Sequence, residues 1–310
     1  MVTAGASVRA SLFDRAAATF AMTRPDHAGL LPCPLCLTLF AREDALAGAL
    51  TVEHVPPKSV GGRPLVLTCV SCNSAAGADV DAAWSAWNRV SDFAFHRPTT
   101  IRAKLGVDGV SQRVNVSSTG DGVLIMGVPA AGHPSIPGQI SEALSRAAVA
   151  DGPLQFSIEL EDRVRLRPLQ LSVLRAAYLV AVHSLGWRYA LTSAFEPLRS
   201  QLEAPDAEFL IPPVILDPSR TVEDPVVMVV HEPHDLRSVA VSFGGQHAFL
   251  PRPDEDAGFF ARITEVLATT FNGQDAHWRG VSVLPPASPY LLDEWPQAVR
   301  ELIPTGRDVV

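Results

Sequence analysis

The sequence has few lysines and no long apolar segment. Only two of its 310 residues are lysine, Lys58 and Lys104, and we draw no function from this bias. No apolar run reaches the roughly 20 residues that a membrane-spanning helix needs. The best candidate, Leu171 to Trp187, is interrupted by charged and polar side chains. Residues 1–9 lack the charged and apolar regions of a secretory signal peptide. We therefore expect a cytoplasmic protein that does not bind a membrane.

The charge of the chain is unevenly distributed. The net charge is −8, and hydrophobic residues make up 47% of the sequence, enough to bury a core. Residues 114–310 carry fourteen arginines and twenty-four acidic residues, whereas residues 33–113 are near neutral. The neutral part permits nucleic-acid binding without being a signature of it. We expect the acidic part to bind a protein partner or a second copy of the chain.

The four cysteines form two C-x-x-C pairs, with none left over: Cys33 with Cys36, and Cys69 with Cys72. In a reducing compartment this pattern indicates metal ligation. Four thiolates in a tetrahedral arrangement suit a structural Zn²⁺ ion. Simple zinc ribbons separate their pairs by roughly 15 to 20 residues. Here 32 residues lie between Cys36 and Cys69, so a folded segment is expected between the pairs.

The segment between and after the pairs predicts a strand, a turn, a strand and a helix. Residues 50–54 and 64–68 have strand character, and Gly61-Gly62 favours a turn between them. A helix is expected from the second pair to about Asp92. A further helix over 6–22 leads into the first pair.

Beyond residue 98 the pattern becomes that of a mixed domain. Strands are expected over 100–105, 110–116, 122–128, 154–160, 226–231, 238–243 and 247–250, and helices over 139–150, 169–187, 194–202 and 257–271. The apolar helix over 169–187 is interpreted as plain core. The fold class expected is α+β. A helical lead-in (1–29) precedes a small zinc-stapled ββα-metal module (30–97), and a larger mixed α+β domain of unknown fold (98–310) follows.

The residues around the cysteine pairs resemble a known nuclease family. Glu53-His54 is followed by Pro57, Ser59 and Gly61-Gly62, and the second pair is followed at once by Asn73. This pattern resembles the HNH endonucleases, in the form that places its active site between two C-x-x-C knuckles. The resemblance covers about residues 30–95. It implies metal-dependent hydrolysis of phosphodiester bonds in nucleic acid, with DNA the expected substrate.

The resemblance also implies a role for each site residue. Phosphodiester cleavage needs a nucleophile made from water and a positive charge at the phosphate. Glu53 takes the metal-binding acidic place, His54 the general-base place, and Asn73 the last metal-binding place. Mg²⁺ or Mn²⁺ is the expected catalytic ion, because hard cations prefer oxygen ligands. Asp81, eight residues further along the helix, is a further metal-ligand candidate.

Two features of the hairpin bear on this hypothesis. Adjacent strand residues point to opposite faces, so Glu53 and His54 share one site only if the strand bends or twists there. Pro56-Pro57 is expected to cause that bend. Lys58 and Arg63 are expected to contact nucleic-acid phosphates.

One departure from the family leaves alternatives open. The stretch Arg63–Thr68 contains no asparagine, where the family places a middle asparagine that orients the histidine. A second hypothesis is therefore a zinc knuckle that binds nucleic acid or protein without cutting. A third makes the C-terminal part the active one. It ranks last because residues 114–310 offer no recognisable catalytic set.

Overall fold

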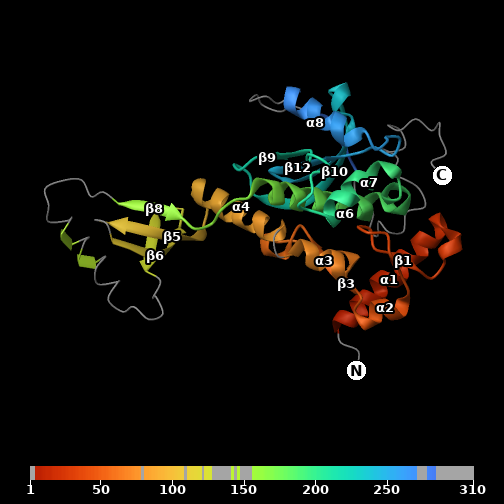
Figure 1. The fold of residues 1–310 in the computed structure, drawn as a ribbon, viewed down its shortest axis with the longest axis horizontal. Helices are drawn as coiled ribbons and strands as arrows, with labels where there is room; N and C mark the ends of the chain where they lie inside the picture. The colour runs from red at the N-terminus through yellow and green to blue at the C-terminus, as the bar shows by residue number, and fades with distance from the viewer. Residues whose placement is uncertain are drawn as a thin grey trace. The chain divides into compact units, whose positions relative to one another are not determined.

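The computed structural model describes residues 4–77, 80–107, 110–120, 122–127, 141–142, 145–146, 156–270 and 278–283. The chain divides into two compact units, coloured by residue number in Figure 1. Unit 1 comprises Met1–Trp84 and Leu166–Val310, and unit 2 comprises Ser85–Arg165. These bounds differ from the three expected segments, because the long apolar helix after residue 165 packs with the cysteine-containing part.

The first part of unit 1 is a helix followed by a short hairpin. α1 (Ala4–Thr23) buries one face through Phe13, Ala16 and Phe20. After the short helix η1 (Pro25–His27), strand β1 (Leu31–Pro32) pairs with β2 (Leu39–Phe40), and α2 (Arg42–Ala47) follows. The first cysteine pair lies in the loop between β1 and β2.

A second hairpin and a helix follow, in the predicted order. β3 (Leu50–Val55) pairs antiparallel with β4 (Arg63–Cys69), and α3 (Val70–Gly77) begins directly after it. A Cβ atom at Gly62 would overlap the carbonyl oxygen of Pro56, so the loop requires glycine there. The expected single helix is described as two, α3 and α4 (Val80–Ala94).

The rest of unit 1 is a sheet packed against one long helix. α6 (Leu166–Ala190) contacts β9, β10, β11 and β12 of a five-stranded antiparallel sheet with the order β13-β10-β11-β12-β9. The strands are β9 (Val214–Leu216), β10 (Val222–Glu232), β11 (Ser238–Gly244), β12 (Gln246–Leu250) and β13 (Arg279–Val283). The remaining helices are η3 (Ser193–Phe195), α7 (Glu196–Glu203), η4 (His234–Leu236) and α8 (Phe259–Thr270). By length and composition α6 could cross a membrane, but 89% of its most apolar window is buried inside the protein.

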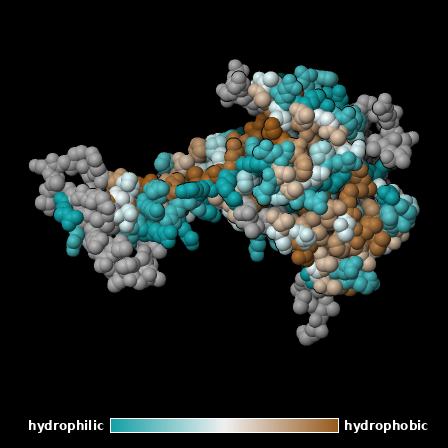
Figure 2. All heavy atoms as spheres, in the orientation of Figure 1, coloured by the Kyte–Doolittle hydropathy of each residue, from teal (hydrophilic) through white to brown (hydrophobic). Residues whose placement is uncertain are grey.

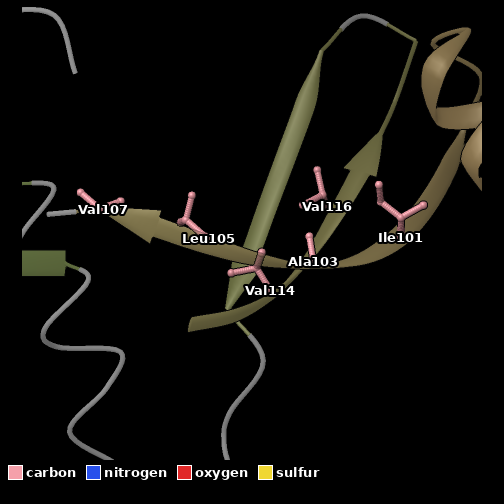
Figure 3. Close-up of a cluster of buried hydrophobic side chains, with 6 residues drawn as sticks. All are labelled: Ile101, Ala103, Leu105, Val107, Val114 and Val116. Atoms are coloured by element: carbon pink, nitrogen blue, oxygen red, sulfur yellow. The ribbon is translucent and has the colours of Figure 1, made fainter. Parts of the chain in front are cut away.

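Unit 2 contains a four-stranded sheet with the order β7-β6-β5-β8. Its strands are β5 (Thr99–Val107), β6 (Val110–Ser118), β7 (Val123–Gly127) and β8 (Ser157–Leu160). Alternate residues of β5 are buried, as the sequence pattern predicts. Ile101, Ala103, Leu105, Val107, Val114 and Val116 form the buried cluster in Figure 3. The helix predicted over 139–150 lies mostly outside the described residues.

The described residues confirm a mixed α+β fold. The surface is not uniformly polar, and brown hydrophobic residues gather over the region of α1, β1 and α2 in Figure 2. Val8, Met22, Leu39 and Leu46 are exposed there.

Candidate metal centre and polar network

The two C-x-x-C pairs come together in space. The four Sγ atoms all lie within 4.8 Å of one another, and they belong to Cys33, Cys36, Cys69 and Cys72. The Cys36 and Cys69 sulfurs are 3.8 Å apart. A tetrahedral ion with Zn–S bonds of about 2.3 Å separates its sulfurs by about 3.8 Å. The spacing and the donor type both fit a structural zinc ion.

Backbone geometry brings each pair into position. In the first loop, the amide of Cys33 donates to the Thr38 carbonyl at 2.9 Å, and the amide of Leu37 donates to the Cys33 carbonyl at 2.8 Å. Cys69 ends β4 and Cys72 lies in the first turn of α3. The Cys69 amide lies 3.4 Å from the Cys33 sulfur and donates to it. The end of one hairpin is therefore tied to the loop of the other.

The four thiols perturb one another's ionisation. The pKa of Cys33 is lowered to about 5, chiefly because the Cys72 thiol donates a hydrogen bond to it. The same bond raises the pKa of Cys72. The pKa of Cys69 is raised by burial, with the Cys33 charge contributing. Four thiolates at this separation repel one another, and a bound divalent cation removes that repulsion.

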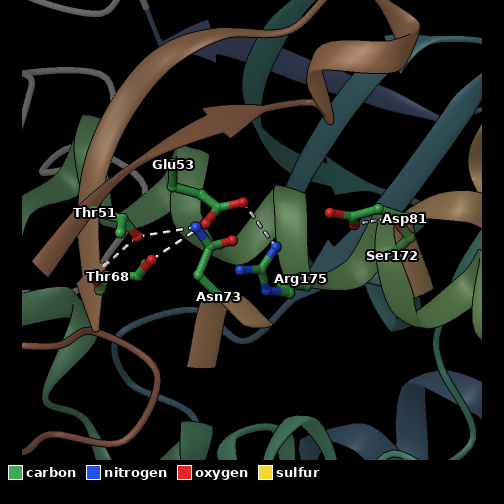
Figure 4. A network of polar contacts seen from close by, with 7 residues as sticks. All are labelled: Thr51, Glu53, Thr68, Asn73, Asp81, Ser172 and Arg175. Carbon is green, nitrogen blue, oxygen red and sulfur yellow. Dashed lines mark hydrogen bonds and ion pairs between the residues drawn. The ribbon is translucent and has the colours of Figure 1, made fainter. Parts of the chain in front are cut away.

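Glu53 is buried beside the cluster, with both carboxylate oxygens engaged. Its side chain is about 5% exposed. The Thr68 hydroxyl donates to Oε2 at 3.2 Å, and Nη1 of Arg175 donates to Oε1 at 3.0 Å. Arg175 is also about 5% exposed. Figure 4 shows Arg175 beside Glu53, reaching it from α6.

Asn73 joins the same network from α3. Its Nδ2 atom donates to Thr51 Oγ1 at 2.9 Å, and the Thr51 hydroxyl donates to the Thr68 carbonyl at 3.4 Å. Thr51 faces Thr68 across the hairpin. Glu53 and Asn73 are thus linked through two threonines (Figure 4). The Oδ1 atom of Asn73 accepts no hydrogen bond from any residue that the structure describes.

His54 lies next to Glu53 but outside this network. Thr51 and Glu53, two residues apart, both join the network, as strand alternation requires. The hairpin register shifts between Glu53 and His54, so the regular ladder is interrupted at that point. His54 is half-buried. Its imidazole makes no hydrogen bond within the described part of the chain.

Asp81 lies near Arg175, apart from Asn73 and Glu53. It accepts a hydrogen bond from the Ser172 hydroxyl at 3.1 Å. Burial raises the pKa of Asp81, and the positive charge of Arg175 offsets part of that rise. In Figure 4, Arg175 lies between Glu53 and Asp81. Among the described residues, the cysteines form the only group of three or more cysteine, histidine or acidic side chains close enough to share a metal ion.

Three polar residues of α6 lie on one face of the helix and bond to residues of the cysteine-containing part. Ser172, Arg175 and Tyr178 follow each other at three-residue spacing. They bond, respectively, to Asp81, to Glu53 and to the carbonyl of Pro34. The apolar character of this helix favours plain core and does not single out Arg175 as a site residue. The available signal was the charge itself, since a buried arginine in an apolar helix requires an anionic partner.

The two cations expected to contact phosphate lie at the exposed end of the hairpin. Lys58 begins the short helix η2 (Lys58–Val60) in the loop. Arg63 begins β4 and forms an ion pair with Asp224 at 3.2 Å. Both partners of that pair are more than 70% exposed, so the interaction is weak and Arg63 stays accessible.

Comparison of this chain with family models, with curated proteins and with solved structures finds no match. Functional inference therefore depends on the residues and their geometry.

Proposed function

We propose that this protein is a metal-dependent HNH-type endonuclease that hydrolyses phosphodiester bonds in nucleic acid, with DNA as the substrate. The observation that carries the proposal is the joint placement of Glu53 and Asn73. The β3–β4 hairpin and α3 supply them to one polar network, beside four cysteines spaced for zinc. The motif resemblance assigns metal-binding places to these same two residues.

The donor atoms fit the two metals differently. The four cysteine sulfurs suit Zn²⁺, which would staple the hairpin, the helix and the first loop. Glu53 offers a carboxylate and Asn73 offers its Oδ1 atom, and these oxygens suit Mg²⁺ or Mn²⁺. When bound, such a cation stabilises the negative charge that develops on the phosphate. Asp81 is bonded to Ser172 and is a weaker candidate ligand.

The remaining roles follow from the exposure and chemistry of the side chains. His54 takes the proton from the attacking water, because an imidazole accepts protons at neutral pH. Its freedom from other hydrogen bonds among the described residues leaves both ring nitrogens for that task. Lys58 contacts a substrate phosphate as a point charge. The Arg175 guanidinium holds the Glu53 carboxylate in place through their ion pair at 3.0 Å.

A second candidate function is a zinc knuckle that binds nucleic acid or protein without cutting it. One observation favours it: Glu53 is nearly fully buried and both its carboxylate oxygens already accept hydrogen bonds. The positive charge of Arg175 opposes a divalent cation at the same carboxylate.

Plasmid cleavage separates the two candidates. Purified protein is incubated with supercoiled DNA, with and without Mg²⁺ or Mn²⁺, beside the variant His54→Ala. The matched control is His234→Ala, because the His234 side chain is 81% exposed on η4. Zinc content is measured for all three proteins to show that the four-cysteine zinc site is intact.

Metal-dependent nicking that the His54 variant loses and the His234 variant keeps supports the nuclease. DNA binding without nicking, unaffected by Mg²⁺, supports the binding module. Equal nicking by all three proteins contradicts the role of His54.

A further inference from the structure

Arg175 uses only part of its hydrogen-bonding capacity on Glu53. A guanidinium carries five N–H donors. Nη1 donates to Glu53, whereas Nη2 is buried and has no partner among the described residues. Leaving a buried charged donor unpaired is costly, so an acceptor is expected on that side.

A small cavity lies next to this arginine. It has a volume of about 20 Å³ and is lined by Leu35, Cys36, Cys72, Arg175, Leu202 and Glu203. A space of this size holds one water molecule. Cys36 and Cys72 come from different knuckles, so the cavity joins Arg175 to both halves of the cysteine cluster. One turn along α6, the Tyr178 hydroxyl donates to the Pro34 carbonyl at 2.9 Å, which seats the helix on the first knuckle.

The charge of the loaded cluster gives the arginine its role. A zinc ion bound by four thiolates leaves a net charge of about −2, which burial makes unfavourable without a compensating cation. Hydrogen bonds to metal-bound ligands commonly raise metal affinity. Among the residues that line the cavity, Arg175 is the one cation, and Glu203 is exposed to solvent.

We propose that Arg175 is the shared counter-charge of the zinc thiolates and Glu53. Nη2 donates to Cys36 or Cys72, directly or through one water in the cavity, while Nη1 holds the carboxylate in place. Arg175 is thus a positioning residue that ties the zinc staple to the candidate active site. The inference rests on the zinc centre of the proposed function and is independent of nuclease activity.

Zinc retention tests this proposal without any cleavage assay. Zinc-loaded protein is mixed with a chromophoric chelator, and the rate of zinc release is recorded for the wild type, Arg175→Met, Arg175→Lys and Glu53→Gln. The matched control is Arg252→Met, because Arg252 is equally buried and pairs with Asp254, outside the cavity. Thermal unfolding of each protein shows how much stability each substitution removes.

We expect Arg175→Met to release zinc about tenfold faster than the wild type, in line with losses seen for residues that support metal ligands. Arg252→Met is expected to stay within about twofold of the wild type, since it retains Arg175. Glu53→Gln loses the same buried ion pair as Arg175→Met but retains Arg175, so it is expected to release zinc clearly more slowly than Arg175→Met. The Co²⁺-substituted Met variant is also expected to show a shifted thiolate charge-transfer band.

Two results overturn the proposal. One is zinc release from Arg175→Met within about twofold of the wild type. The other is equally fast release from Glu53→Gln or Arg252→Met, which would make the effect one of general destabilisation. If the Met variant does not fold, Arg175→Lys decides. The lysine keeps the positive charge, so zinc release from this variant is expected to stay within about threefold of the wild-type rate. Release tenfold faster than the wild type would refute the proposal.

Discussion

Removing one partner of the Glu53–Arg175 ion pair is expected to destabilise unit 1 strongly. The atoms are 3.0 Å apart and both side chains are about 5% exposed. At an effective dielectric constant of about 20, the attraction at this distance is on the order of 5 kcal/mol. Breaking a buried pair by removing one charge typically costs about 3 to 5 kcal/mol, because the other charge stays buried without its partner.

A double-mutant cycle isolates this interaction. Glu53→Gln leaves Arg175 without its anion, and Arg175→Met leaves the carboxylate without its cation. The double variant removes both charges and replaces the ion pair by groups of similar volume. It is expected to be more stable than the sum of the single losses predicts, by about 2 kcal/mol or more.

Denaturant unfolding of zinc-loaded protein measures each corner of the cycle. The matched control is a second cycle on Arg63 and Asp224, whose ion pair at 3.2 Å is more than 70% exposed. That cycle is expected to give about 0 to 1 kcal/mol. Single losses below about 1 kcal/mol at Glu53 and Arg175, or losses that simply add, would refute the inference that this pair is a buried, coupled unit.

Two further predictions concern pH and the hairpin loop. Burial lowers the pKa of His183 and of His247 to about 4. The unfolded chain therefore binds more protons between pH 4 and 6.5, and stability is full above pH 6.5 and falls as the pH drops. From pH 7.5 to pH 5 each histidine is expected to cost about 2 kcal/mol, measured by urea unfolding. Replacement of both by leucine should flatten this dependence, and an unchanged slope would contradict the assignment. Gly62→Ala is expected to destabilise the protein by about 1 to 3 kcal/mol in the same assay, because its Cβ would overlap the Pro56 carbonyl. Gly122→Ala, with open space around its Cβ, is the control, and equal effects of the two substitutions would argue against steric overlap.

Local sequence patterns were sufficient to predict several elements in both units. The alternation of 100–105 predicted β5, because it reports which side chains face a core. The near-continuous apolar character of 169–187 predicted that α6 is a buried helix. Gly61-Gly62 predicted the hairpin turn through backbone freedom alone. The very short strands β1 and β2 were missed, since two residues carry no period.

The number and spacing of the cysteines also predicted that the two pairs meet in one cluster. Two C-x-x-C pairs are a local signal, and a tetrahedral ion accepts ligands from any separation along the chain, so the 32 intervening residues were no obstacle. Their meeting in space is confirmed. The roles of Glu53, His54 and Asn73 stay predictions.

Only the tertiary structure placed Arg175 against Glu53. These residues are 122 positions apart, and no local period or propensity relates them. Sequence alone determined that α6 is apolar enough to be buried, but a helix can bury any of its faces against a partner that the pattern does not identify. In the folded protein, the face that carries Ser172, Arg175 and Tyr178 packs against Asp81, Glu53 and Pro34. A buried charge is stable only where its counter-charge is, and that place is decided by the assembled fold.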